Sequence, residues 1–323
     1  MKKILVTGGA GFIGGNFIHY LLKHFPHYKI YNLDALTYAG DLSKHIHIEK
    51  NPQYSFLHAN IIDFDIILSL YKQFQFDYVI HFAAESHVDR SIQDPNLFIK
   101  TNVVGTQNLL EAARQVGVSK FIHVSTDEVY GELDFDPTTF FTEETPLQPN
   151  SPYSASKAAS DLLVRAYYET YSLPINITRC SNNYGPYQYP EKLIPLTITK
   201  VFKGENIPIY GDGQNIRDWL HVYDHCSAID LIMHSGLVGE VYNIGGHNEL
   251  TNLEVAKRII NVLGQSEQLI SFVPDRLGHD KRYAIDPSKL ESLGWKPTYS
   301  FDTGIVQTIE WYLQNNWVKQ MSY

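Results

Sequence analysis

The chain has 323 residues, of which 44% are hydrophobic, 19% charged and 13% aromatic, a composition typical of a globular protein. Its formal net charge of -9 argues against a surface that binds DNA or RNA. The two cysteines, Cys180 and Cys226, provide neither a disulfide framework nor a metal-binding pattern, which favours a reducing compartment. Since we find no signal-peptide core and no apolar run long enough to span a membrane, we expect a soluble cytoplasmic protein.

In the first half of the chain, short apolar runs typical of strands alternate with helical patterns. The expected strands cover residues 2–8, 28–34, 76–84, 120–127 and 173–180. The expected helices cover residues 16–25, 64–74, 96–117 and 151–171. This alternation predicts an α/β protein, in which crossover helices connect the strands of a parallel sheet.

After residue 183 the alternation becomes irregular, and residues 219–236 and 240–246 predict one more helix and strand that return to the sheet. The residues from 252 onward predict a smaller, mostly helical C-terminal lobe. We therefore expect two units that are interleaved in sequence. Residues 1–188 with 222–250 would form the sheet domain, and residues 189–221 with 251–323 would form a substrate-binding lobe.

Three glycines, Gly8, Gly11 and Gly14, lie between the first predicted strand and the helix that follows it. In this context glycines permit a tight turn and the close approach of a pyrophosphate to the helix N-terminus, whose N–H groups and dipole favour an anion. Asp34 stands at the end of the second strand, where a carboxylate accepts hydrogen bonds from a ribose diol and repels a 2′-phosphate. The pattern predicts a Rossmann-type, doubly wound sheet that binds NAD rather than NADP.

Tyr153 and Lys157 are one helical turn apart on a predicted helix, so they share one face. A phenol with an ordinary pKa near ~10 is a poor base at neutral pH. A nearby ammonium group and the positive nicotinamide ring both favour the phenolate, so we expect the pKa of Tyr153 to be lowered. Tyr153 would then accept a proton from a substrate hydroxyl while hydride passes to NAD.

The glycine pattern, the carboxylate and the Tyr–Lys pair together resemble the extended short-chain dehydrogenase/reductase family. The similarity extends over essentially the whole chain, including AAESHVDRS at residues 83–91, TNVVGT at 101–106 and CSNNYGPYQYPEKLIP at 180–195. The resemblance implies a Rossmann-fold enzyme that uses NAD and acts on a nucleotide sugar covered by the C-terminal lobe. It also implies a homodimer joined through a four-helix bundle.

Asp127 and Glu128 follow Thr126 at the end of a predicted strand, where ligands of open α/β sheets bind. An epimerase needs no acid–base pair beyond the tyrosine and a Ser or Thr, whereas the elimination of water does. Once C4 of a hexose is a ketone, a carboxylate can remove the C5 proton while a carboxylic acid protonates the departing C6 hydroxyl. The triplet resembles that of family members that perform 4,6-dehydration of dTDP-glucose, which implies that Thr126 bonds the reacting hydroxyl, Asp127 is the acid and Glu128 is the base.

The same resemblance assigns binding roles to two larger sets of residues. The cofactor would be bound by Gly8, Gly11, Phe12, Ile13, Gly14, Asp34, Leu36, Thr37, Asn60, Ile61, Ala83, Ala84, Ser86, Thr101, Tyr153, Lys157 and Asn183. The nucleotide sugar would be bound by His87, Thr126, Asn182, Lys192, Leu193, Pro208, Tyr210, Arg217, Asn252, Asp275 and His279. Among them, Arg217 carries the planar cation that suits a diphosphate.

Asn60 departs from the family, which commonly has aspartate at this position. Its neutral amide can accept a hydrogen bond from an adenine amine but carries no charge, which predicts weaker retention of NAD. Two alternatives stay open. One is a dehydratase or epimerase that acts on a UDP-, CDP- or GDP-linked sugar, because no residue reads the base directly. The more remote one is a non-catalytic NAD-sensing protein, although the Tyr–Lys pair and both acids are all present.

Overall fold

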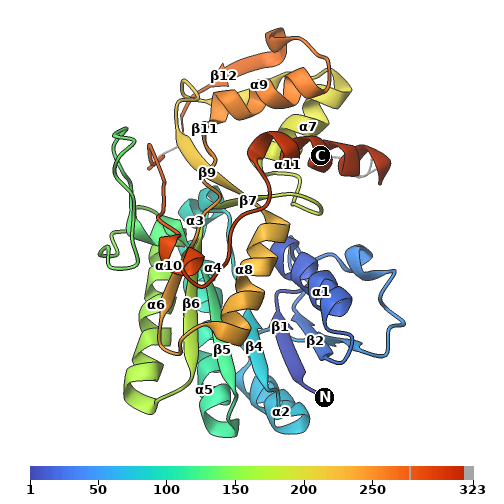
Figure 1. Ribbon diagram of the computed structural model, residues 1–323, viewed down its shortest axis with the longest axis vertical. Coiled ribbons are helices and arrows are strands. Elements are labelled where there is room, and N and C mark those ends of the chain that lie inside the picture. The colour runs from blue at the N-terminus through green and yellow to red at the C-terminus, as the bar shows by residue number, and fades with distance from the viewer. Residues whose placement is uncertain (276–277, 316–323) are drawn as a thin grey trace.

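The structure is a computed structural model that describes residues 1–275 and 278–315, and its centre is a seven-stranded sheet (Figure 1). The strand order is β10-β6-β5-β4-β1-β2-β3, and every neighbouring pair is parallel. These strands are β1 (Lys3–Thr7), β2 (Lys29–Asp34), β3 (Tyr54–His58), β4 (Tyr78–His81), β5 (Lys120–Thr126), β6 (Ile175–Cys180) and β10 (Val241–Ile244). The order reverses between β1 and β4, which opens a ligand crevice at their carboxyl ends. The predicted Rossmann-type, doubly wound sheet is confirmed.

Helices cover both faces of this sheet (Figure 1). On one face α1 (Phe12–His24) packs against α8 (Val222–Ser235). On the other face α5 (Thr106–Val116) lies between α2 (Phe64–Phe74) and α6 (Pro152–Tyr171). Each face therefore has its own apolar core, which explains why the strands read as continuous apolar runs rather than as alternating patterns.

A smaller lobe lies beyond the carboxyl ends of the large sheet and contains two small sheets (Figure 1). The first has the order β11-β9-β7, and in the second β12 pairs with β8. The strands are β7 (Asn182–Tyr184), β8 (Ile207–Tyr210), β9 (Ile216–His221), β11 (Glu249–Thr251) and β12 (Ile270–Val273). The helices around them are α7 (Leu193–Lys203), α9 (Asn252–Val262) and α11 (Phe301–Gln314). The expected helical lobe is thus built on strands as well.

Short helical segments complete the chain. They are η1 (Leu42–His45), α3 (Val88–Gln93), α4 (Pro95–Phe98), η2 (Ile99–Gly105), η3 (Asp127–Tyr130), η4 (Glu267–Leu269) and α10 (Ser288–Glu291). Within the described ranges, no helix is both long and apolar enough to cross a membrane. Residues 276–277 and 316–323, which the sequence assigns to the substrate-binding lobe, lie outside the described residues.

The structure differs from the predicted elements in two further places. Residues 219–221 belong to strand β9, and the helix begins only at Val222, because β9 is the central strand of its sheet and buries Trp219 and Leu220. The edge strand β3 is not among the predicted elements. Its burial is only partial, so its apolar signal is weaker than that of the central strands.

The predicted helix at residues 96–117 is continuous but contains the π-helical segment η2. The carbonyl of Asn102 in this segment accepts hydrogen bonds from the hydroxyls of Thr106 and Ser160, both at 2.6 Å. The Asn102 amide in turn holds the backbone N and O of Glu85 at 2.8 and 2.9 Å. π-Helical turns often occur at functional sites, and this one joins a segment of the crevice to α6.

Candidate active site

The turn after β1 requires glycine at two positions. Gly8 has a φ of +71°, and a Cβ there would lie 2.6 Å from the backbone N of Ala83. A Cβ at Gly14 would lie 2.5 Å from the carbonyl oxygen of Gly8. Any side chain at these positions would force β1, β4 and the start of α1 apart. The turn therefore brings its backbone N–H groups and the N-terminus of α1 to the mouth of the crevice, as a pyrophosphate needs.

Asp34 is held at the end of β2 by the backbone. Its Oδ2 accepts a hydrogen bond from the Ala10 N–H at 2.9 Å, and its Oδ1 accepts one from the Leu36 N–H at 2.8 Å. Leu36 adopts a φ of +52°, which turns the chain back across the crevice. Asp34 thus has a fixed orientation and still has lone pairs for a ribose diol.

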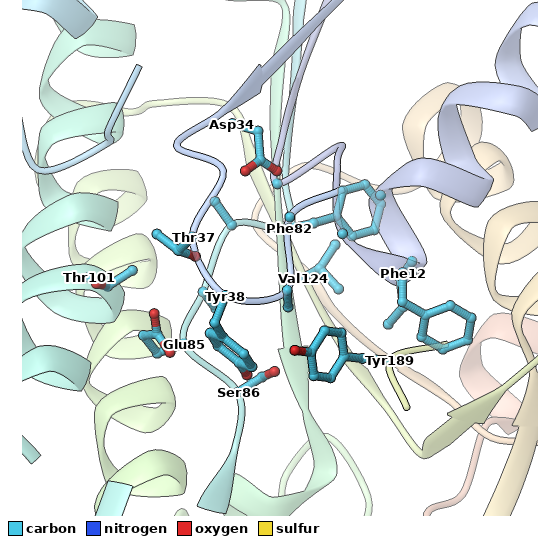
Figure 2. A pocket seen from close by; sticks show the side chains of 18 of the residues that line it. Phe12, Asp34, Thr37, Tyr38, Phe82, Glu85, Ser86, Thr101, Val124 and Tyr189 are labelled. Atoms are coloured by element: carbon cyan, nitrogen blue, oxygen red, sulfur yellow. The ribbon is translucent and has the colours of Figure 1, made fainter. Parts of the chain in front are cut away.

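A cavity of about 400 Å³ lies in the crevice, and Asp34, Thr37, Ser86 and Val124 contribute to its wall (Figure 2). The predicted site residues that line it are Gly8, Gly11, Phe12, Ile13, Gly14, Asp34, Thr37, Asn60, Ile61, Ala83, Ala84, Ser86, Thr101, Thr126, Tyr153, Lys157, Asn182, Asn183 and Lys192. The glycine turn, the fixed carboxylate and the elongated set of lining segments fit a dinucleotide such as NAD.

The cavity also has lining residues that are not among the predicted ones, including Tyr38, Lys44, Glu85, Gln188, Tyr189 and Glu191. Tyr38, Glu85 and Glu191 are immediate neighbours of predicted residues, so adjacency in sequence was an available signal, and Gln188 and Tyr189 lie in the segment at residues 180–195 that carries the family resemblance. Lys44 had no such signal. It is only 3% exposed, and its Nζ donates to the carbonyl oxygen of Ala10 at 2.8 Å, which ties the segment after β2 to the glycine turn.

Aromatic and charged side chains meet across the opening of the cavity. The rings of Tyr38 and Tyr189 lie 5.4 Å apart, edge to face, and Figure 2 shows them approaching from two different segments. The Arg90 guanidinium lies 3.8 Å from the centre of the Tyr38 ring. Nearby, Nε2 of His87 is 3.5 Å from Glu191. Residues of the large domain and of the segment before α7 therefore close the same rim.

Tyr153 and Lys157 lie on α6, whose first turn is fixed by a reciprocal capping box between Ser151 and Ser154. Both side chains are buried, and the Lys157 Nζ donates to the carbonyl oxygen of Val124 at 2.8 Å. We expected the pKa of Tyr153 to be lowered. As far as the protein's own groups are concerned, that expectation is wrong. Burial raises the pKa of Tyr153 well above 10.0, and the charge of Glu128 raises it further, while a hydrogen bond with Thr126 lowers it.

Asp127 and Glu128 follow Thr126 at the carboxyl end of β5 and form the first turn of η3. Asp127 is 1% exposed, and burial raises its pKa well above 3.8, with the charges of Glu128 and Asp218 adding to the rise. Glu128 is only partly buried. Burial therefore favours the neutral, protonated form of Asp127, which is the form that a general acid needs.

Arg217 on β9 belongs to the smaller lobe, and its charge acts on Asp127. Its Nη2 donates to the carbonyl oxygen of Asp280 at 2.9 Å, and its guanidinium lies 4.2 Å from the centre of the Tyr283 ring. Its positive charge opposes the rise in the Asp127 pKa. The predicted diphosphate ligand Arg217 and the predicted acid Asp127 are therefore coupled electrostatically.

The other predicted lobe residues lie outside the lining of the cavity. His279 and Asp275 form an ion pair at 2.6 Å, and the ring of His279 lies 6.3 Å from that of Tyr210 on β8. Pro208 is on the same strand, Leu193 begins α7, and Asn252 begins α9, whose cap is Thr251 rather than Asn252.

Asn60 lines the cavity, but its Oδ1 already accepts a hydrogen bond from the Ile62 N–H at 3.1 Å. Asn183 is likewise oriented by the protein, since its Oδ1 lies 2.9 Å from Nδ1 of the buried His225 and its Nδ2 donates to the Ser181 carbonyl. Both amides therefore face the cavity in an orientation set by neighbouring backbone and side-chain groups.

Comparison with known proteins gives a consistent result. The family model described as GDP-mannose 4,6 dehydratase matches residues 5–308. The dTDP-glucose 4,6-dehydratase of Xanthomonas campestris pv. campestris strain B100 is 52% identical, over 99% of this chain and 95% of the relative. The crystal structure of dTDP-glucose 4,6-dehydratase from Bacillus anthracis in complex with NAD is 51% identical, with a TM-score of 0.93 and full coverage of both chains.

The chain is also similar to a more distant enzyme. The UDP-glucose 4-epimerase of Thermus thermophilus in complex with NAD is 32% identical, with a TM-score of 0.89, over 96% of this chain and 99% of the other. The fold, the glycine turn with its carboxylate and the Tyr–Lys pair define an NAD-dependent enzyme of nucleotide-sugar metabolism. The chain belongs to the epimerase and dehydratase branch of the extended short-chain dehydrogenase/reductase family.

Proposed function

We propose that the protein is a hydro-lyase that converts dTDP-glucose into dTDP-4-dehydro-6-deoxy-glucose with NAD as cofactor. The observation that carries this proposal is the pair of acids after Thr126, of which Asp127 is buried with a raised pKa while Glu128 is only partly buried. Such a pair suits an elimination, and an epimerase does not need it. The similarity in sequence and structure to dTDP-glucose 4,6-dehydratases supports the same substrate.

Tyr153, Lys157 and Thr126 would carry the first step. Bound NAD supplies a hydride acceptor at C4 of the sugar and returns the hydride at C6. Tyr153 takes the proton of the C4 hydroxyl on its phenolic oxygen, and Thr126 bonds the same hydroxyl. Because burial opposes the phenolate, the ammonium of Lys157 and the positive charge of the oxidised ring are what make Tyr153 a base.

Asp127 and Glu128 would carry the second step. With a ketone at C4, Glu128 removes the C5 proton through its carboxylate, and Asp127 gives its proton to the departing C6 hydroxyl, which leaves as water. When hydride is returned to C6, Glu128 gives its proton back to C5, and the proton held by Tyr153 balances the one that Asp127 has lost, so exchange with solvent restores both groups. The burial of Asp127 at the end of β5 favours its protonated form, while the more open position of Glu128 suits the ionised form. The two roles follow from two different environments at adjacent positions.

The proposal also assigns a different ligand to each of the two lobes. Residues 1–188 with 222–250 would bind NAD, and residues 189–221 with 251–323 would bind the nucleotide diphosphate. The glycine turn supports the first assignment, and the position of Arg217 beside Asp127 supports the second. His87, Asn182 and Lys192 would contact the sugar nucleotide from the rim of the cavity.

A direct test is to incubate the purified protein separately with dTDP-, UDP-, CDP- and GDP-linked hexoses and to detect the 4-keto-6-deoxy product. We expect product from dTDP-glucose at the highest kcat/KM. Product only from another nucleotide would assign the protein to a different branch of the dehydratases, and epimerised sugar without keto product would make it an epimerase. The absence of keto product from dTDP-glucose would refute the proposal.

We also propose that the protein is a cytoplasmic homodimer. Apolar side chains are exposed on neighbouring helices of one side of the large domain, including Ile92 on α3, Ile99 and Val104 on η2, and Leu162 on α6. A second copy that covers them would remove this apolar surface from water. Light scattering of the purified protein at several concentrations tests the dimer, and a monomeric mass throughout would reject it.

A further inference from the structure

A cluster of buried polar side chains lies behind the cavity, beneath the helix that carries Tyr153. His123 on β5, Asp161 on α6 and Arg179 on β6 are 0%, 1% and 6% exposed. They do not belong to the lining of the cavity. Burying a charged pair costs free energy that hydrophobic side chains of the same volume do not cost, so its place in the core calls for a reason.

In the described part of the chain, Asp161 is the only anion in direct contact with His123 and Arg179. Its Oδ2 accepts a hydrogen bond from the Arg179 Nε at 2.9 Å, while its Oδ1 lies 3.4 Å from Nε2 of His123. Burial lowers the pKa of His123 to about 4, so the imidazole is neutral at neutral pH. Asp161 is therefore neutralised by a single formal cation at hydrogen-bonding distance.

Lys157 precedes Asp161 by one turn of α6, so the two side chains lie on the same face of the helix. The Lys157 Nζ donates to the carbonyl oxygen of Val124, the residue after His123 on β5. The titratable groups that act on Lys157 or Asp161 from the surrounding elements are His81, His123, Arg179 and Cys180. Within this interior Lys157 and Arg179 are the cations, and Asp161 is an anion whose charge acts on both of them.

We propose that Asp161 is a positioning residue that keeps the ammonium group of Lys157 charged while Tyr153 acts as the base. The inference deepens the proposed function and rests on the role given there to Lys157. Without Asp161, the cluster would keep two buried cations and lose the anion whose charge acts on both. Arginine does not lose its proton, so the lysine would lose its own. The neutral amine could no longer stabilise the phenolate of Tyr153.

The pH dependence follows from the charges that act on Lys157. Burial lowers the pKa of Lys157 to about 8, and the carboxylate of Asp161 is the largest influence that opposes this decrease. Removing that carboxylate lowers the pKa further. The active, protonated fraction of Lys157 then disappears at a lower pH, so the alkaline limb of the kcat profile moves down by about one pH unit or more.

The experiment is the pH profile of kcat and KM for dTDP-glucose, measured on the holoenzyme and on Asp161→Asn. We expect the alkaline limb of kcat to move to lower pH, with kcat near that of the wild type on the acid side of the limb and KM changed less than twofold. Ser160→Ala is the matched control, because this neighbouring buried side chain donates only to backbone carbonyls of Asn102 and Ser156. A uniform loss of kcat at every pH with an unmoved limb would overturn the proposal.

Arg179→Gln provides a second variant with the opposite sign, and it decides the matter if Asp161→Asn does not fold. Removing the Arg179 cation leaves the charge of Asp161 to Lys157 alone, so the alkaline limb should move to higher pH. A limb that stays in place or moves down contradicts the inference. The proposed function fails separately, if the wild type makes no keto product or if Lys157→Met turns over normally.

Discussion

Replacing Asp127 with asparagine separates the stability of the site from its chemistry, because the two side chains have nearly the same shape. Since the pKa of Asp127 is raised well above 3.8 in the folded protein, the native state keeps a proton that the unfolded state has lost above about pH 4. The wild type therefore loses about 1.4 kcal/mol of unfolding free energy per pH unit from about pH 4 up to the folded pKa. Asparagine does not ionise, so the unfolding free energy of the variant does not decrease with pH for this reason.

From pH 5 upward the unfolding free energy of Asp127→Asn should rise relative to that of the wild type by about 1.4 kcal/mol per pH unit, until the pH reaches the raised pKa of Asp127 in the folded protein. Urea unfolding at pH 5, 6 and 7, with equal protein concentration and saturating NAD, measures this difference. Asp134→Asn, a change at an exposed carboxyl, is the control and should show no such trend. The same Asp127 variant should lose 10²- to 10⁴-fold in kcat, because no acid protonates the C6 hydroxyl. If the two unfolding profiles run parallel with pH, Asp127 is ionised in the native protein and the acid assignment is wrong.

Three other substitutions test the remaining parts of the site. Glu128→Gln should allow oxidation at C4 but stall elimination, so absorbance of reduced cofactor should accumulate on mixing with dTDP-glucose; normal turnover contradicts the base assignment. Tyr153→Phe should slow formation of that absorbance by about 10²- to 10⁴-fold, and a wild-type rate would show that another group takes the proton. Lys44→Met removes a charged donor to the Ala10 carbonyl and should weaken NAD binding about tenfold, measured by titration of NAD-free protein with Lys44→Arg as the control; unchanged affinity rejects the role of Lys44.

Features that depend on local geometry were predictable from the chain alone. Gly8, Gly14 and Asp34 could be recognised because a tight turn needs glycine and because the carboxylate ends a strand of clear apolar pattern. The shared face of Tyr153 and Lys157 follows from helical spacing. In contrast, the end of strand β9 was predicted to be helical. Its strand conformation depends on pairing with β7 and β11, which come from distant parts of the sequence, so the local pattern does not reveal it.

The order of the elements, the cofactor turn and the residue types of the site could be read from the chain alone, since each depends on periodicity or spacing within one segment. The electrostatic environment of the site residues, in contrast, arises only in the folded protein. The pKa of Asp127, Tyr153 and Lys157 depends on how completely water is excluded and on charges carried by other elements, such as Asp218 on β9. The tertiary structure also brings Asp161 and Arg179 together beneath α6. Coulomb interactions and desolvation act through space, so contacts between distant segments determine them.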